Sequence, residues 1–144
     1  MFWGMITAMI SGALMSIQGV FNTEVSKQTS MWVSASFVQL TAFVVCIIAW
    51  LLTGRDASLT SIISVSPKYL LLGGAMGAFI TFTVVSSVGS LGPAKSVMFI
   101  VTAQVVCAYL IELFGLFGME RIGFEWQKVI GLILTIAGII IFKW

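Results

Sequence analysis

The sequence predicts an all-α integral membrane protein with five transmembrane helices. Of its 144 residues, 60% are apolar and only 8% are charged, whereas a soluble domain carries about 25% charged residues. The apolar residues form five continuous runs, without the alternation that barrel strands show. At roughly 20 residues per helical span, five helices use almost the whole chain. We therefore expect a single transmembrane domain over residues 1–144.

Polar clusters mark where each span begins and ends. The first run ends at Asn22, the second begins at Trp32, and a Ser-rich stretch to Pro67 precedes the third. Glycines around Pro93 separate the third run from the fourth, and charged residues around Arg121 separate the fourth from the fifth. The expected spans are residues 2–22, 32–53, 69–88, 95–117 and 128–143.

The first and last spans have distinctive flanks. No basic stretch precedes the first span, which is also long for a signal-peptide core, so we expect it to be retained. The last span has about 16 residues and a length of about 24 Å. Interfacial tryptophans and snorkelling lysines allow so short a helix to span. The flanking residues of this kind are Trp126, Lys128, Lys143 and Trp144.

The composition excludes several classes of function. Twelve charged residues cannot cover a soluble enzyme of this size, and a net charge of +2 without a basic cluster argues against nucleic-acid binding. Histidine, the commonest general base and metal ligand, is absent. Cys46 and Cys107 stand singly in apolar runs, which is neither a disulfide framework nor a zinc spacing. We expect no enzymatic activity, no metal and no cofactor.

The basic residues are almost balanced between the two sides of the membrane. Five spans place four on one side and three on the other: Arg55, Lys68, Arg121 and Lys128 against Lys27, Lys95 and Lys143. Orientation follows an imbalance of Lys and Arg, and here there is almost none. One explanation is that the N-terminal half decides, or that a loop is misassigned. The other is that the chain inserts both ways and pairs with itself upside down, supplying both inverted repeats of a transporter.

One face of the first span is polar and its neighbour is built of small residues. Spacings of 4, 7 and 4 place Thr7, Ser11, Gln18 and Asn22 on one helical face. We expect Gln18 and Asn22 to face a cavity and bind substrate, whereas the hydroxyls of the other two can bond back to their own helix. The alternative is that this face only joins helices. The predicted packing positions in spans 1, 3 and 5 are Gly4, Ala8, Gly12, Gly73, Gly77, Gly131 and Gly138.

Glu112 is the only carboxylate that the expected spans place inside the membrane. The middle of residues 95–117 is near residue 106, so Glu112 would lie about 9 Å from it along the helix. Ionisable residues at such depth are costly and usually functional, which favours a role in coupling. The alternative is that the helix ends near Ile111 and leaves Glu112 at the interface. Gln104 and Tyr109 could share a polar patch with it and bind substrate.

The chain resembles the YdcZ-type family, a short branch of the drug/metabolite transporter superfamily related to the EamA-like transporters. The resemblance covers nearly the whole chain. Where the family usually has Gly-Gln and then Asp-His-Phe-Gly, Ala103, Glu112 and Leu113 replace its glycine, aspartate and histidine. The acid is kept, but no imidazole is present there for a proton role. The segments that carry the resemblance are Gly12, Gln18 and Asn22; Ser36-Phe37; Gly73-Gly74-x-x-Gly77; Leu91-Gly92-Pro93-Ala94; Ala103-Gln104; and residues 112–118.

The resemblance implies a five-helix protomer that dimerises antiparallel into a ten-helix, EamA-like fold in the bacterial inner membrane. The leading hypothesis is a secondary transporter of a small organic solute, driven by an ion gradient through alternating access. Gln18 and Asn22 would contact the substrate, and Glu112 would carry the coupling proton or bind a cationic group. The rival is a non-transporting accessory protein that packs against a partner subunit. A channel is a weaker candidate, because no filter loop or charged ring is present.

Overall fold

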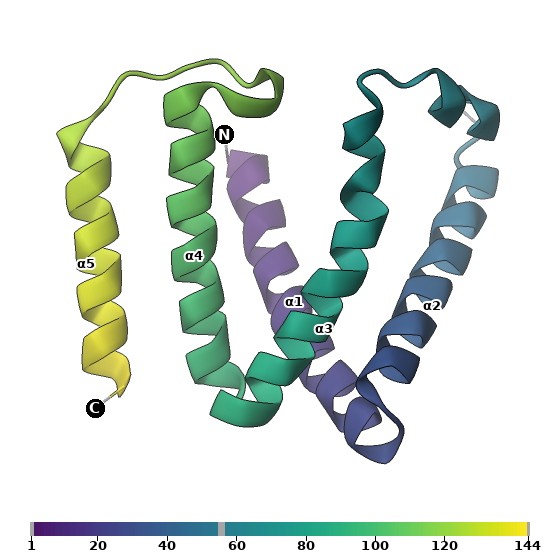
Figure 1. Cartoon of the computed structure of the whole chain (residues 1–144), viewed down its shortest axis with the longest axis horizontal. Coiled ribbons are helices and arrows are strands. Elements are labelled where there is room, and N and C mark those ends of the chain that lie inside the picture. The colour runs from purple at the N-terminus through teal and green to yellow at the C-terminus, as the bar shows by residue number, and fades with distance from the viewer. Residues whose placement is uncertain (1, 55–56, 144) are drawn as a thin grey trace. The chain divides into compact units, whose positions relative to one another are not determined.

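A computed structural model describes residues 2–54 and 57–143, and these residues are organised by helices alone (Figure 1). Arg55, which entered the charge count, and Trp144, which entered the aromatic belt, lie outside the described residues. Short 3₁₀ helices are η1 (Leu59–Ser64), η2 (Lys68–Leu72) and η3 (Leu116–Gly118). The long helices are α1 (Phe2–Gln28), α2 (Met31–Leu52), α3 (Gly73–Leu91), α4 (Pro93–Phe114) and α5 (Trp126–Lys143). The predicted all-helical class is confirmed.

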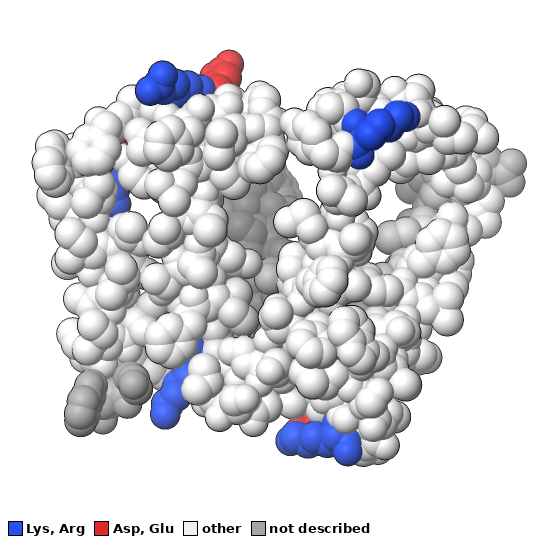
Figure 2. Space-filling view, in the orientation of Figure 1, with Lys and Arg blue, Asp and Glu red and all other residues white. Residues whose placement is uncertain are grey.

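The helices have the lengths and surfaces of membrane spans. By length and composition, four segments are suited to crossing a membrane: α1, α2, η2 with α3, and α4. The fifth apolar helix, Trp126–Phe142, is shorter. In Figure 2 the charged side chains lie at helix ends, and the flanks between them carry none. Among the described hydrophobic residues only Ala35, Val85 and Val88 are buried. Lipid, rather than a protein core, therefore supplies the apolar surroundings.

The chain divides into two compact units, Met1–Ser90 and Leu91–Trp144. Within each unit, successive long helices run antiparallel (Figure 1). The buried residues of the first unit lie where the C-terminal part of α1 meets the start of α2 and the second half of α3. Small residues make this approach possible: a Cβ on Gly19 would lie 3.3 Å from Val84 Cγ1. The hydroxyl of Ser34 donates to the main-chain oxygen of Asn22 at 3.0 Å and joins α1 to α2.

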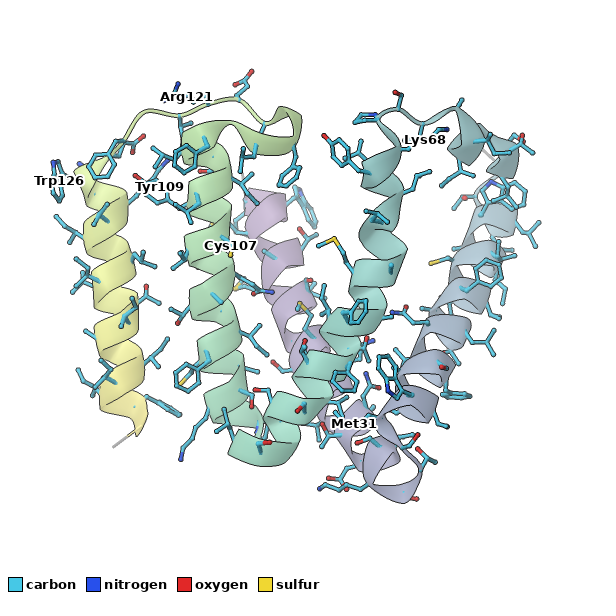
Figure 3. The ribbon with its side chains drawn as sticks, viewed as in Figure 1. Met31, Lys68, Cys107, Tyr109, Arg121 and Trp126 are labelled. Atoms are coloured by element: carbon cyan, nitrogen blue, oxygen red, sulfur yellow. The ribbon has the colours of Figure 1, made fainter. Side chains whose placement is uncertain are left out.

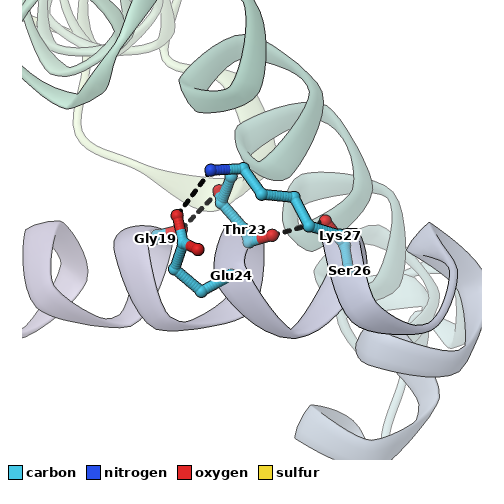
Figure 4. Close-up of polar contacts among 5 residues, drawn as sticks. All are labelled: Gly19, Thr23, Glu24, Ser26 and Lys27. Atoms are coloured by element: carbon cyan, nitrogen blue, oxygen red, sulfur yellow. Dashed lines mark hydrogen bonds and ion pairs between the residues drawn. The ribbon is translucent and has the colours of Figure 1, made fainter.

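α1 continues six residues beyond its predicted end at Asn22 (Figure 4). The hydroxyl groups in this part of the helix donate hydrogen bonds to main-chain oxygens of the same helix. Thr23 donates to the Gly19 oxygen at 2.7 Å, and Ser26 donates to the Thr23 oxygen at 2.8 Å. Lys27 and Glu24, three residues apart, form an ion pair at 2.6 Å. The polar cluster therefore ends the apolar segment but not the helix, because helical hydrogen bonding does not require apolar side chains.

α4 ends earlier than the sequence predicts, and this corrects the placement of Glu112. Gly115 adopts a left-handed conformation (φ 63°) and its N–H bonds to the carbonyls of Ile111 and Glu112, which terminates the helix. The middle of α4 then lies between residues 103 and 104, about 13 Å along the axis from Glu112. The distance of about 9 Å, which assumed a helix over residues 95–117, is therefore corrected to about 13 Å. Since half the hydrocarbon thickness is about 15 Å, we expect Glu112 near the membrane interface. This agrees with the interfacial alternative, although the helix passes Ile111.

Candidate functional site

An open groove runs along α1 and contains the polar face that the sequence predicts. Its volume is about 610 Å³. The four polar residues expected on one face, Thr7, Ser11, Gln18 and Asn22, all line it. The other lining residues are apolar: Ile10, Leu14, Met15, Ile17 and Phe21. The groove thus combines amide and hydroxyl groups with an apolar wall, and none of its described lining residues carries a charge.

The polar groups of this groove differ in how far they are already engaged. The hydroxyl of Thr7 donates back to the carbonyls of Trp3 and Gly4, each at 3.0 Å, as the sequence suggested. Gln18 is exposed, whereas Asn22 is only 8% exposed. The main chain of Asn22 is held by Ser34, so its position is set by the α1–α2 crossing. Gln18 and Asn22, one helical turn apart, are therefore the main candidates for contacting a solute.

The predicted packing glycines fall into two groups. Gly77 lies in a contact, since a Cβ there would be 3.2 Å from Gln39 Nε2. In the second group, a Cβ added to any of the glycines would meet nothing within 4 Å among the described residues. Ala8, the remaining predicted packing position, is exposed. These glycines present close-approach surfaces that the described chain itself leaves uncovered. They are Gly4, Gly12, Gly73, Gly131 and Gly138.

A second groove, of about 420 Å³, lies between α4 and α5 and contains Glu112. Figure 3 shows Tyr109 of α4 on the side that faces α5. Lys128 Nζ lies 3.9 Å from Glu112 Oε2 and 3.6 Å from Glu125 Oε1, and 5.9 Å from the centre of the Tyr109 ring. The side chains of Glu112 and Lys128 are 45% and 36% exposed, so their attraction is moderated by solvent. The lining residues are Val105, Ala108, Tyr109, Glu112, Lys128, Gly131, Leu132 and Thr135.

The segment after α4 folds back and holds this charged cluster together. The Ile122 N–H donates to the Glu112 main-chain oxygen at 3.1 Å, and Arg121 Nε donates to the Leu113 oxygen at 3.2 Å. The Glu125 N–H donates to the Tyr109 hydroxyl at 3.3 Å. Figure 3 shows Arg121 and Trp126 along this returning segment. Carbonyls at the C-terminal end of α4 therefore accept hydrogen bonds from the loop that carries Glu125 toward Lys128.

Sequence reasoning found only part of this second groove. It placed Tyr109 near Glu112, and both line the groove. Gln104 is exposed and does not line it, since Gln104 lies about 80° round the helix from Glu112, whereas Val105 lies on nearly the same face as Glu112. Glu125 and Lys128 were interpreted as a loop residue and a flanking lysine. Their separation of three residues on a helix start predicts that they pair, but only the antiparallel α4–α5 arrangement brings Glu112 to them.

Comparison with known proteins identifies a family. The family described as "Putative inner membrane exporter, YdcZ" matches residues 3–141. No curated protein and no solved structure matches the chain. An exporter is a transporter rather than an enzyme, and several helices here are long and apolar enough to span a membrane. The protein is thus a multi-pass protein of the inner membrane. The predicted resemblance is confirmed: the chain belongs to the YdcZ family of inner membrane exporters.

Proposed function

We propose that the protein is a secondary transporter that exports a small organic solute through the α1 groove. The observation that carries the proposal is the gathering of Thr7, Ser11, Gln18 and Asn22 in one groove of about 610 Å³. Binding sites for small molecules are commonly concave, mostly apolar, and furnished with a few oriented polar groups. A groove with amides and no charged lining residue suits a solute that is recognised by hydrogen bonds. The match to an exporter family supports the same conclusion.

Glu112 is the proposed coupling residue. At rest its counter-ion is Lys128, 3.9 Å away. A carboxylate near the membrane interface that is half-exposed can exchange this partner for a proton or a cationic group arriving from the aqueous side. Movement of that charge with the ion gradient would then drive alternating access. Tyr109, 5.9 Å from the lysine by its ring centre, would help to position Lys128 during the exchange.

The proposed working unit is an antiparallel homodimer. Two observations support it: the near balance of Lys and Arg between the two sides, and the open glycines outside the α4–α5 groove, where an added Cβ would meet nothing within 4 Å among the described residues. Two oppositely oriented copies would supply the inverted repeats around which many transporters are built. The α1 grooves of the two copies would then form one central pathway.

Cysteine labelling tests whether the α1 groove is accessible to water. After Cys46 and Cys107 are replaced by serine, cysteines are placed at Ser11 and Gln18 in the groove and at Met9 and Ala13 outside it. All four residues are exposed, so burial does not distinguish them. In cells, a membrane-impermeant maleimide should label the groove positions several-fold faster than the other two. Equal inertness at all four would overturn the pathway and favour the accessory-protein alternative.

Reporter fusions test the dimer. A reporter fused after Trp144 should report both sides of the membrane, and two lysines added between α4 and α5 should fix one orientation. A single orientation that persists after such additions would overturn the antiparallel arrangement. The solute itself can be sought by comparing the extracellular metabolites of cells that express the unmodified chain or the Gln18→Ala variant.

A further inference from the structure

The groove between α4 and α5 is charged at one end and apolar at the other. On α4 it extends from Glu112 to Val105, and on α5 from Lys128 to Thr135. The two ends of each stretch are seven residues apart, or about 10 Å along the helix. Leu132 and Ala108 line the apolar part. The hydroxyl of Thr135 donates to the Gly131 oxygen at 2.9 Å, so this residue adds little polarity.

The membrane sets the surroundings of the two ends. With Glu112 about 13 Å from the middle of α4, the charged end lies near the interface, and Val105 lies within about 3 Å of the middle. Val105 is 42% exposed, so the apolar end is open, and lipid chains would reach it at this depth of a membrane. A freely soluble polar solute would gain nothing there. The groove instead suits an amphiphile that lies parallel to the helices with its headgroup beside Glu112.

The charged end offers both signs within a short distance. Lys128 Nζ is shared between Glu112 at 3.9 Å and Glu125 at 3.6 Å. These contacts are loose compared with the 2.6 Å pair between Lys27 and Glu24. Charge-assisted hydrogen bonds normally close to about 2.7–2.9 Å, so all three groups keep the capacity to bind an external partner. Two carboxylates and one ammonium also leave one negative charge in excess.

We propose that this groove binds a zwitterionic phospholipid whose headgroup carries a primary ammonium. The lipid phosphate would contact Lys128, and its ammonium would contact Glu112 and Glu125. One acyl chain would lie along Val105, Ala108 and Leu132. A two-carbon linker keeps the ammonium and the phosphate of such a headgroup close together, which matches the closeness of the acid and the base here. A quaternary headgroup has no N–H to donate, and an anionic headgroup has no cation to place beside the carboxylates.

Gly131 leaves the space that the chain of the lipid would occupy. A Cβ on this residue would meet nothing within 4 Å, although Gly131 lines the groove. The inference goes beyond the proposed export function and does not depend on it. Because both ligands use Glu112, a bound headgroup and a coupling cation would exclude one another. Lipid binding would therefore compete with coupling.

Lipid retention by the purified full-length protein tests the proposal. The protein is placed in nanodiscs of equimolar phosphatidylethanolamine, phosphatidylcholine and phosphatidylglycerol, extracted, and analysed by native mass spectrometry. We expect phosphatidylethanolamine to be enriched about twofold to fivefold among the retained lipids, as half-exposed ion pairs contribute up to about 1 kcal/mol. Gly131→Leu fills the groove and Glu112→Gln removes an acceptor, and both should abolish the enrichment.

Matched variants separate this outcome from general damage. Gly138→Leu changes the same helix at an open position outside the groove, and Glu24→Gln removes a carboxylate of the first unit. Both should retain the enrichment. Equal retention of the three lipids by the unmodified protein would overturn the proposal. The proposal would also be overturned if Gly131→Leu separated a dimer but left lipid retention unchanged. A second copy of the chain, rather than a lipid, would then cover the groove. The maleimide and metabolite assays test export independently.

Discussion

The two grooves of this protein differ in how they are built and in what they can recognise. The α1 groove is lined by a single helix, and none of its described lining residues is charged. The end of the groove at Asn22 lies beside the close crossing around Gly19. The α4–α5 groove is lined by two helices and brings a carboxylate and an ammonium together. A single helix can present a polar face through its own periodicity. A charged pair from distant residues requires two helices to be brought side by side.

The difference agrees with the two separate roles that are proposed for these residues. Gln18 and Asn22 offer hydrogen bonds without charge, which suits recognition of a solute. Glu112 and Lys128 offer an exchangeable ion pair, which suits coupling or binding of a charged headgroup. If this division is correct, variants in one groove should affect the other role little, because additive behaviour is usual for sites without shared partners.

The largest expected effect follows removal of the charge in the α4–α5 groove. Glu112→Gln keeps the shape of the side chain but cannot be charged, so cation- or proton-dependent export should fall by at least about tenfold, or about 1.4 kcal/mol. Glu112→Asp should retain part of the activity. Transport into inverted vesicles, with and without an imposed pH gradient, measures this. Unchanged export by Glu112→Gln in both conditions would show that coupling resides elsewhere.

The next effect concerns the crossing that supports the α1 groove. Gly19→Leu must displace Val84, since even a Cβ would lie 3.3 Å from Val84 Cγ1. Overpacking of this kind costs about 1–3 kcal/mol. The variant should lose thermal stability in detergent, as measured by the loss of monodisperse protein on heating. Ala13→Leu, at an exposed position of the same helix outside the groove, serves as its control. Equal stability of the two variants would contradict the close packing at Gly19.

Truncation of an amide in the α1 groove should have a moderate effect. Gln18→Ala removes one hydrogen-bonding group from the groove, and a net hydrogen bond contributes about 0.5–1.5 kcal/mol. We expect the apparent affinity for the exported solute to fall by about twofold to tenfold, with its dependence on the ion gradient unchanged. Dose–response curves at two values of external pH measure both quantities. A change in the pH dependence alone would assign Gln18 to coupling.

The smallest effect is expected at the loop that supports the charged groove. Tyr109→Phe keeps the ring beside Lys128 but removes the acceptor of the Glu125 N–H, whose hydrogen bond measures 3.3 Å. Since this N–H is exposed and water can replace the hydroxyl, the cost should be about 0.5 kcal/mol. Hydrogen exchange at Glu125 should accelerate about twofold. An unaltered exchange rate at this amide would show that the loop is held by the bonds of Arg121 and Ile122 alone.

Much of the fold and part of the site follow from local patterns in the sequence. Continuous apolar runs predict five helices, because a backbone in hydrocarbon must satisfy its own hydrogen bonds. The spacing of Thr7, Ser11, Gln18 and Asn22 predicts one polar face, because a helix repeats every 3.6 residues. The matching of an exporter family to residues 3–141 agrees with the family resemblance carried by short motifs. Helix ends were less predictable, since Thr23, Ser26 and Lys27 continue α1 through local bonds.

Contacts between distant residues were decided by the tertiary structure. The left-handed turn at Gly115 ends α4 and moves Glu112 toward the interface. The returning loop then places Lys128 beside a carboxylate sixteen residues earlier. Neither result follows from hydropathy, because the apolar run continues past Gly115 and residues so far apart share no helical period. By itself, the sequence determined which residues are apolar and which helical face is polar; only the packing of α4 against α5 determined which charges meet.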